Sequence, residues 1–492
     1  MGNAVEHKLL RLRSASGYRP RVLDLFAGCG GLSLGFQAAG FDIAAAIEID
    51  ATASLTHAAN FYSDKGHSTV AAHGMPRDIT KLEPGRIGAE FGLGDPARAI
   101  DLIIGGPPCQ AYARIGRAKL RNVAARPDAF RVDPRANLYL RYLHYIGRLK
   151  PLAILMENVP DIMNFGGHNV VQEICEALDG LGYDARYSLI NSAHFGVPQM
   201  RDRVFMVAFR KELAATTFFP VATHRCDLPA GYVGQRRVAL KLVDLFNGQA
   251  YCDAAGLGHS LLPAVTARQA IGDLPAITSH IEGRQRRGAQ RFDQLALYQQ
   301  ARPSNYARGM RNWPGLQSDL GVMDHVMRRL PRDTPIFAAM APGSEYPAAQ
   351  RLAVELFERE ARRRRTKLGT AAWDELRRSM VPPYDPGKFP NRWWKLEANK
   401  PVRTLTAHIG KDTYTHIHYD DAQGRVISVR EAARLQSFPD GFRFCGSMNA
   451  AYRQIGNAVP PLMAKSLAEL ILAELRRCSR RRRATSLAIA AE

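Results

Sequence analysis

Short apolar runs alternate with helix-length amphipathic stretches over the first 210 residues of the chain. The apolar runs have the length of β-strands and lie at residues 22–26, 43–48, 101–104, 153–157, 187–190 and 204–209. Helix-length stretches separate them, among them residues 138–149 and 170–181. This alternation predicts an α/β fold in which helices cover a mostly parallel sheet. Ligands of such sheets bind outside the carboxyl ends of the strands.

The regular alternation ends near residue 215. The following stretch is rich in Arg, Pro and Gly, and only short helices are expected in it, such as one over residues 353–365. Near residue 401 order returns, and apolar residues at helical spacing after Pro460 and Pro461 predict another helix. We therefore expect a first domain over 1–214, a second and irregular domain over 215–400, a return to the first domain over 401–475, and a basic disordered tail over 476–492.

Charge narrows the choice of partner. The formal net charge is +21 and the pI is about 9.9. Basic residues cluster, because residues 281–380 hold 19 Lys or Arg against 11 Asp or Glu, and residues 476–483 include six Arg. Neutralising phosphates releases bound counterions, so a basic surface favours nucleic acid as the partner.

The rest of the composition is that of a soluble globular protein, with 46% hydrophobic residues. No apolar run approaches the length of a transmembrane helix, and the first residues lack the apolar stretch of a secretory signal. We therefore expect a cytoplasmic protein that is associated with the nucleoid and has no membrane partner.

Seven cysteines are present, an odd number with irregular spacing and no C-x-x-C pair. Neither a disulfide framework nor a zinc or other metal site is predicted from them. One or two are candidates for chemistry, and the others are expected to be small buried apolar residues. They are Cys29, Cys109, Cys175, Cys226, Cys252, Cys445 and Cys478.

A glycine-rich segment, residues 23–35, follows the first predicted strand. Glycines there let the backbone pass close to a ligand, and the next helix start offers free N–H groups. Position 33, where the dinucleotide fingerprint needs its third glycine, is Ser33, which counts against a nicotinamide or flavin enzyme. Glu48, at the end of the second strand, is placed to accept hydrogen bonds from ribose hydroxyls, and Asp78 could bind an adenine amino group. Together they favour a nucleoside without a pyrophosphate.

Cys109 is the candidate nucleophile. It follows a buried strand and the sequence Gly105-Gly106-Pro107-Pro108. Prolines stiffen such a loop and glycines let it hinge, so the thiol is presented rather than packed.

Three further residues are candidates for catalysis. Glu157 ends an apolar run, and a carboxyl held out of water tends to keep its proton, which makes Glu157 a candidate proton donor. Arg201 and Arg203 alternate into the last predicted strand and are expected on one face of it. Two arginines there suit an anion or a carbonyl oxygen.

In this order, the motifs resemble those of the DNA cytosine-5 methyltransferases of the bacterial modification type. The similarity spans about residues 20–210 and 400–475, and the family places its variable target-recognition domain between these parts. The matching segments are 28–35 for the first cofactor motif, Glu48 and Asp78 for the ribose and adenine contacts, 105–110 for the nucleophile loop, 157–159 for the proton donor, 199–203 for the arginine motif, 430–439 for the ninth motif and 454–460 for the tenth.

The resemblance implies a Rossmann-like methyltransferase domain, a smaller target-recognition domain, and S-adenosylmethionine as the methyl donor. It also implies a specific duplex DNA site with a flipped-out cytosine, a role in restriction-modification or phage defence beside a cognate nuclease, and action as a monomer on DNA. The implied catalytic residues are Cys109, Glu157, Arg201 and Arg203. The implied DNA contacts are Gln110, Arg114 and Gln199. The implied cofactor contacts are Phe26, Ala27, Gly28, Gly30, Gly31, Leu32, Glu48, Ile49, Asp78, Ile79, Gly106, Pro107, Asn137, Asn457 and Ala458.

One departure from the family pattern follows Gln110. The family usually has Gly or Ala there, then Phe and Ser, and this chain has Ala111, Tyr112 and Ala113. The aromatic ring is kept and one hydroxyl is lost, which we interpret as tuning of the loop. Two alternatives stay open. The first is an enzyme that methylates RNA, although RNA-directed relatives have short recognition segments. The second is a catalytically silent relative that binds DNA, which intact catalytic motifs disfavour.

Overall fold

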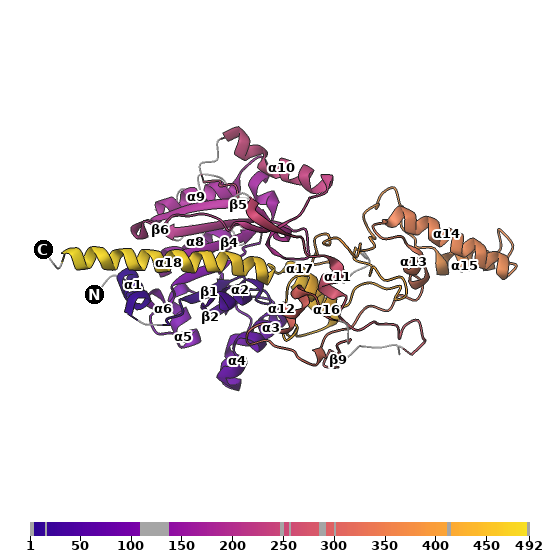
Figure 1. The fold of residues 1–492 in the computed structure, drawn as a ribbon, viewed down its shortest axis with the longest axis horizontal. Coiled ribbons are helices and arrows are strands. Elements are labelled where there is room, and N and C mark those ends of the chain that lie inside the picture. The colour runs from indigo at the N-terminus through magenta and orange to yellow at the C-terminus, as the bar shows by residue number, and fades with distance from the viewer. Residues whose placement is uncertain are drawn as a thin grey trace. The chain divides into compact units, whose positions relative to one another are not determined.

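The computed structural model describes residues 4–14, 17–108, 137–246, 250–254, 257–284, 292–299, 302–410 and 415–489. The chain divides into two compact units (Figure 1). Unit 1 consists of Met1–Ala264 and Ala458–Glu492, and unit 2 consists of Val265–Asn457.

Unit 1 is built on a six-stranded sheet of order β2-β1-β3-β4-β6-β5. All neighbouring pairs up to β4 are parallel, and β6 runs antiparallel to both β4 and β5. The six predicted strands and the mostly parallel sheet are therefore confirmed. The strands are β1 (Arg21–Leu25), β2 (Asp42–Ile47), β3 (Leu102–Gly105), β4 (Ala153–Asn158), β5 (Tyr183–Asn191) and β6 (Asp202–Arg210).

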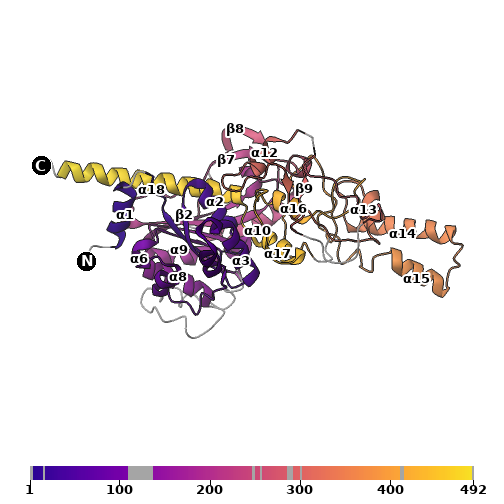
Figure 2. The same ribbon diagram turned by 90° about the horizontal axis from the view of Figure 1, so that it is seen from below.

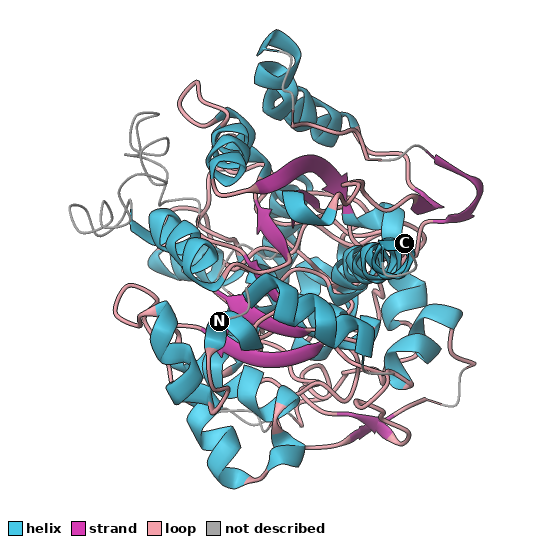
Figure 3. Ribbon diagram, turned by 90° about the vertical axis from the view of Figure 1, so that its left-hand side faces the viewer, coloured by secondary structure: helices cyan, strands magenta, loops and turns pink. Residues whose placement is uncertain are grey.

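Helices surround this sheet (Figure 3). They are α1 (Ala4–Ser14), α2 (Gly31–Ala39), α3 (Ala51–Phe61), α4 (His67–Gly74), α5 (Ile87–Phe91), α6 (Pro96–Ala99), α8 (Asn137–Leu149), α9 (Val170–Gly180), α10 (Ala230–Phe246) and α18 (Pro461–Ile489). Short 3-10 turns include η5 (Pro160–Asn164) and η6 (Ser192–Phe195), and a small parallel pair is formed by β7 (Ala222–Arg225) and β8 (Leu257–Pro263).

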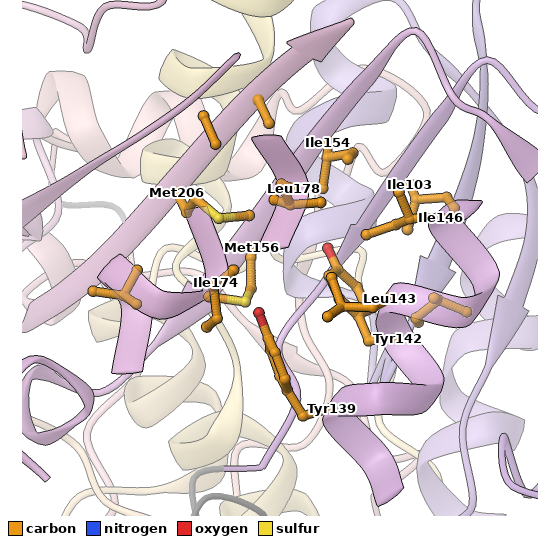
Figure 4. Packing of buried hydrophobic residues seen from close by; sticks show 14 of the residues in the cluster. Ile103, Tyr139, Tyr142, Leu143, Ile146, Ile154, Met156, Ile174, Leu178 and Met206 are labelled. Atoms are coloured by element: carbon orange, nitrogen blue, oxygen red, sulfur yellow. The ribbon is translucent and has the colours of Figure 1, made fainter. Parts of the chain in front are cut away.

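The core of unit 1 lies between the middle strands and two helices. Ile103, Ile154 and Met156 come from β3 and β4, and they meet apolar residues of α8 and α9 (Figure 4). Strand interiors of this kind are buried on both faces, which explains why β3 and β4 read as continuous apolar runs rather than as alternating ones.

Helix α18 packs against α2 (Figure 2). The approach is close, because a Cβ added to Gly35 would lie 2.4 Å from Cβ of Ala464 and 2.5 Å from the backbone nitrogen of Lys465. The predicted helix after Pro461 is confirmed, but its end is not where we expected it. Residues 476–489, predicted to be disordered, continue α18 as helix, since a helix that has already formed extends readily through Arg, Ala and Leu.

Unit 2 contains nine helices and strands within the part of it that the structure describes. They are α11 (Ala267–Ile271), β9 (Ala296–Leu297), α12 (Asn305–Arg311), β10 (Gly321–Val322), α13 (Thr334–Ala339), α14 (Tyr346–Arg363), α15 (Ala371–Met380), α16 (Val429–Leu435) and α17 (Met448–Asn457). The helix predicted over 353–365 is thus the second half of α14. Trp393, Phe337 and Phe357 lie in the apolar core of this unit.

Buried ion pairs also hold unit 2 together. Arg434 Nη2 donates to Asp440 Oδ2 at 2.6 Å, and Arg430 Nη2 donates to Asp324 Oδ2 at 3.0 Å. Both arginines are fully buried, and a buried charge persists only when it is paired. The segment matching the ninth motif thus organises the interior of this unit.

The boundaries of the compact units differ from those predicted for the domains. Residues 215–264 pack with unit 1, and residues 401–457 pack with unit 2. The assignment of catalysis and target recognition to parts of the chain concerns function, so it stays a prediction.

Candidate active site

The glycine-rich segment leaves β1 in a tight left-handed path. Phe26 has φ 62°, Gly28 has φ 55° and Gly30 has φ 97°, a region that non-glycine residues seldom adopt. A Cβ at Gly30 would lie 2.4 Å from the Phe61 ring, whereas a Cβ at Gly28 would meet no described atom within 4 Å. The backbone at Gly28 is therefore exposed to any ligand above the strand ends, as the sequence led us to expect.

Glu48 fixes this loop. Its Oε2 accepts a hydrogen bond from the Gly28 amide and its Oε1 accepts one from the Asp50 amide, each at 2.8 Å. A carboxylate oxygen has two lone pairs, so each oxygen can still accept a hydroxyl. The next residue, Ile49, is 67% exposed, which leaves an apolar side chain at the edge of the same site.

The segment of Asp78 lies next to Glu48, because the Arg77 amide donates to the Glu48 carbonyl at 2.7 Å. Oδ1 of Asp78 accepts hydrogen bonds from the amide and the hydroxyl of Thr80. Asp78 thus caps a local turn with one oxygen, and Ile79 beside it is buried.

Beneath the loop lies a buried polar group. Ser33 Oγ, at the position where a dinucleotide site has glycine, donates to Asp24 Oδ2 at 2.7 Å. His57 Nε2 lies 3.1 Å from the same hydroxyl. Burial raises the pKa of Asp24 to about 7 and lowers the pKa of His57 to about 3, so both side chains favour their neutral forms.

The tenth-motif segment returns to this loop. A Cβ at Gly31 would lie 2.3 Å from the Val459 carbonyl oxygen and 3.2 Å from Cβ of Ala458. Ala458 therefore lies beside the glycine-rich loop within unit 1, and its contact with the cofactor stays a prediction. Leu32 is buried behind the loop, and Asn457 is the exposed last residue of α17 in unit 2.

The loop after β3 is tied to the strand beside it. A Cβ at Gly105 would come within 2.3 Å of the Leu25 carbonyl oxygen, and one at Gly106 would come within 3.1 Å of Oε2 of Glu157. Asn158 Nδ2 donates to the Pro107 carbonyl at 2.7 Å. These contacts fix residues 105–107, the first part of the predicted nucleophile loop. Cys109, Gln110 and Arg114 lie outside the described residues, as does the side chain of Asn137.

Glu157 and Arg203 form an ion pair at the end of β4. Nε of Arg203 lies 2.8 Å from Oε1 of Glu157, and the side chains are 14% and 13% exposed. Nη1 of Arg203 donates to the Asp202 carbonyl at 2.7 Å. Arg201 is 1% exposed and precedes β6. Burial, followed by the charge of Arg203, lowers the pKa of Arg201, and Glu157 opposes this shift.

Gln199 is fully buried, which does not agree with the predicted contact to DNA. The structure therefore gives this contact no support, and it stays a prediction.

Sequence reasoning missed Asp202 and Arg236. Arg236, on α10, places Nη1 at 2.5 Å from Oδ1 of Asp202. The available signal for Asp202 was an acidic residue between two arginines, because such an acid can pair with a third cation. The sequence did not identify Arg236 as that cation, since Arg236 lies 34 residues further along in a stretch without regular alternation.

Among the described residues, no group of three or more His, Cys, Asp or Glu is arranged to hold a metal ion. Within the same part of the chain, no helix is long and apolar enough to cross a membrane.

A family model described as "C-5 cytosine-specific DNA methylase" matches residues 20–252 and 334–473. A protein of Oceanobacillus iheyensis, described as the type II methyltransferase M.OihORF3336P, is 38% identical over 94% of this chain and 97% of its own length. The type II methyltransferase M.AgeI of Thalassovita gelatinovora is 31% identical over 92% of this chain and 99% of its own.

A solved structure supports the fold. A crystal structure of a prophage protein of E. coli, described as a DNA modification methyltransferase, has a TM-score of 0.58 and 23% identity. The match covers 93% of this chain and 99% of that one. The Rossmann-like methyltransferase fold predicted from the sequence is therefore confirmed.

Proposed function

The chain belongs to the C-5 cytosine-specific DNA methylase family, and on that premise we propose how its own residues carry out the reaction. It is a DNA cytosine-5 methyltransferase that uses S-adenosylmethionine. The observation that carries our proposal is the Glu157–Arg203 pair at the carboxyl end of β4, beside a loop that Asn158 holds at Pro107.

We propose that the loop over Phe26–Gly31, Glu48, Ile49 and Asp78 hold S-adenosylmethionine. When bound, it supplies an electrophilic methyl group on a sulfonium. The donor set fits a nucleoside, because the Glu48 carboxylate keeps acceptor capacity for ribose hydroxyls and Ile49 offers an exposed apolar side chain to a purine. Both hydrogen bonds from Thr80 to Asp78 use Oδ1. Oδ2 faces the exposed Lys81 ammonium at 3.9 Å, beyond hydrogen-bond distance, so it can accept a hydrogen bond from an exocyclic amine.

Chemistry at carbon 5 of cytosine needs a nucleophile, because that carbon is unreactive until electron density is placed on it. We propose that the Cys109 thiolate adds to carbon 6 and leaves again when a base removes the carbon 5 proton, with ordered water as the candidate base. Glu157 hydrogen-bonds ring nitrogen 3, so that the ring does not carry a full negative charge. Arg203, with Arg201, holds the carbonyl oxygen and the loop.

The target cytosine must leave the duplex, because its ring face is stacked inside the helix. We propose that the variable segment within residues 215–400 reads the DNA sequence around it, with basic side chains on phosphates and a few on base edges. Its relatives M.AgeI and M.OihORF3336P are described as type II methyltransferases. We therefore propose a modification enzyme of a restriction or defence system, with a cognate nuclease, acting as a cytoplasmic, nucleoid-associated monomer.

A covalent trap tests the catalytic assignment. A target duplex carrying 5-fluorocytosine should form an adduct with the protein only when S-adenosylmethionine is present, because fluorine at carbon 5 blocks the final elimination. The matching RNA should form none. Methylation sequencing of DNA from cells that express the protein identifies the target. An RNA adduct without a DNA adduct would favour the RNA enzyme, and no adduct with either would favour the silent relative.

A further inference from the structure

Helix α10 is hydrogen-bonded to two segments that flank the Glu157–Arg203 pair. On one side, Asn164 Nδ2 at the end of η5 donates to the Val238 carbonyl at 3.1 Å, and η5 follows directly on the end of β4. On the other side, Arg236 Nη1 lies 2.5 Å from Asp202 Oδ1, and its Nη2 donates to the Leu189 carbonyl at 3.1 Å. Thus α10 connects the exit of β4 to the start of β6.

Asp202 relays this contact towards Glu157. Its side chain is 7% exposed and accepts a second hydrogen bond from Asn191 Nδ2 at 3.0 Å. Its carbonyl accepts Nη1 of Arg203, whose Nε is paired with Glu157. Polar contacts therefore link Arg236 on α10, through Asp202 and Arg203, to the Glu157 carboxyl.

Helix α10 packs through its second half, where Ala239 and Val243 belong to the apolar core of unit 1. Its first half is less well packed, because Gly231 and Gly234 are exposed and weaken a helix interior. Arg236, which is 26% exposed, anchors this first half.

We propose that Arg236 is a positioning residue for the Glu157–Arg203 pair and acts through Asp202. This inference rests on the roles proposed above for that pair. Asp202 and Arg203 are consecutive residues of β6, so their side chains point to opposite faces and the coupling runs through the Asp202 carbonyl, which accepts Nη1 of Arg203. Without Arg236 the Asp202 carboxylate loses its ion pair, this carbonyl shifts, and Arg203 moves relative to Glu157. A displacement of about 1 Å at a catalytic group is able to cost roughly 100-fold in rate.

The test compares Arg236→Gln, Arg236→Lys and the matched control Arg237→Gln. The control removes the same charge from the next residue of α10, which is exposed. Single-turnover methyl transfer is measured at saturating S-adenosylmethionine and DNA, with the Kd of each. We expect R236Q to lower the transfer rate by about 10- to 100-fold with both Kd values within about twofold. R236K, which keeps a positive charge beside the Asp202 carboxylate, should regain most of that rate. R237Q should transfer methyl groups at the wild-type rate.

A double-mutant cycle adds a second readout that a purely structural role would not move. Because Arg236 acts through Asp202, adding R236Q to Asp202→Asn should lower the rate little further. The proposal is overturned if R236Q transfers methyl groups at the wild-type rate, or if the two effects multiply. It is also overturned if R236K has wild-type thermal stability but transfers methyl groups no faster than R236Q. This comparison remains decisive if R236Q itself folds poorly. Failure of the proposed function itself would appear separately, as absence of a wild-type adduct with 5-fluorocytosine DNA.

Discussion

The ion pair between Arg203 and Glu157 is a diagonal contact across two antiparallel strands. The register places Glu157 of β4 opposite Phe205 of β6, so Arg203, two residues before Phe205, is on the same face of the sheet. Nε of Arg203 lies 2.8 Å from Oε1 of Glu157. The register of β4 and β6 therefore fixes which side chains meet at the catalytic edge.

We predict that Glu157→Gln lowers the rate of methyl transfer by about 100-fold or more, the contribution typical of a positioned acid or base. The amide keeps the size of the side chain, but it cannot take up and pass on a proton, and it has no negative charge to pair with Arg203. Single-turnover kinetics would measure this, with the Kd of S-adenosylmethionine as the control. A wild-type rate would remove Glu157 from the mechanism.

Cys109→Ser should abolish methyl transfer and the 5-fluorocytosine adduct, because a serine hydroxyl is a far weaker nucleophile towards the pyrimidine ring than a thiolate. Binding of S-adenosylmethionine should survive, since the substitution exchanges one side-chain atom and most of the predicted cofactor contacts lie on other segments. Gel detection of the adduct and calorimetry of the cofactor measure the two properties. Near-normal turnover of C109S would identify another nucleophile.

Glu48→Ala should weaken the binding of S-adenosylmethionine by about 1–3 kcal/mol, the cost of losing a charged hydrogen-bond partner. Part of the lost binding free energy comes from loosening of the glycine-rich loop, because Glu48 also accepts hydrogen bonds from the amides of Gly28 and Asp50. Calorimetry measures the affinity, and the wild-type protein with NAD is the control, which should show no binding. Unchanged affinity would place the ribose elsewhere.

Much of the fold followed from local pattern. All six strands of the sheet were predicted, because buried parallel strands are short apolar runs separated by amphipathic helices. Helix α10 was not predicted, since the stretch around it shows no strand and helix alternation. The extension of α18 was missed because its Arg-rich end resembles a solvated tail, and local composition does not show that a helix is already running into it.

The candidate site was less predictable where contacts join distant residues. Glycines and acids at strand ends predicted that the glycine-rich loop and Glu48 lie together, and a hydrogen bond from the Gly28 amide to Glu48 joins them. The contact between Arg236 and Asp202 depends on where α10 packs, and the burial of Gln199 depends on the rest of unit 1. Neither is encoded in local spacing.

Asp24→Asn should change how stability depends on pH. Burial raises the pKa of Asp24 to about 7. In the unfolded chain the carboxyl ionises near pH 4, so between about pH 4 and 7 the unfolded chain has released a proton that the folded chain keeps. Rising pH therefore favours unfolding in this window. The variant cannot ionise, and its stability relative to wild type should rise from pH 4 to pH 8, by up to about 4 kcal/mol.

His57 provides the internal check on that experiment. Burial lowers the pKa of His57 to about 3. Below about pH 6.5 the unfolded chain therefore binds a proton at His57, whereas His57 stays neutral in the folded chain. This contribution has the opposite slope and remains in D24N, which should lose stability only on the acid side. Denaturant unfolding at pH 4, 6 and 8 measures both slopes. Parallel curves for wild type and D24N would show that Asp24 is ionised in the folded protein.

The last prediction concerns DNA sequence recognition, and the structure decides where the chain should be cut. Exchanging residues 215–400 would remove Arg236 from Asp202 and disturb unit 1, whereas residues 265–400 lie wholly in unit 2. We predict that replacing 265–400 with the matching segment of a relative of known specificity transfers that relative's target sequence, because base contacts worth roughly 1–3 kcal/mol each would come from the new segment. Methylation sequencing reads the outcome. Retention of the original target by an active chimera would mean that specificity comes from the catalytic loop or from residues 215–264, and a second chimera exchanging only 215–264 while keeping Arg236 separates those two sources.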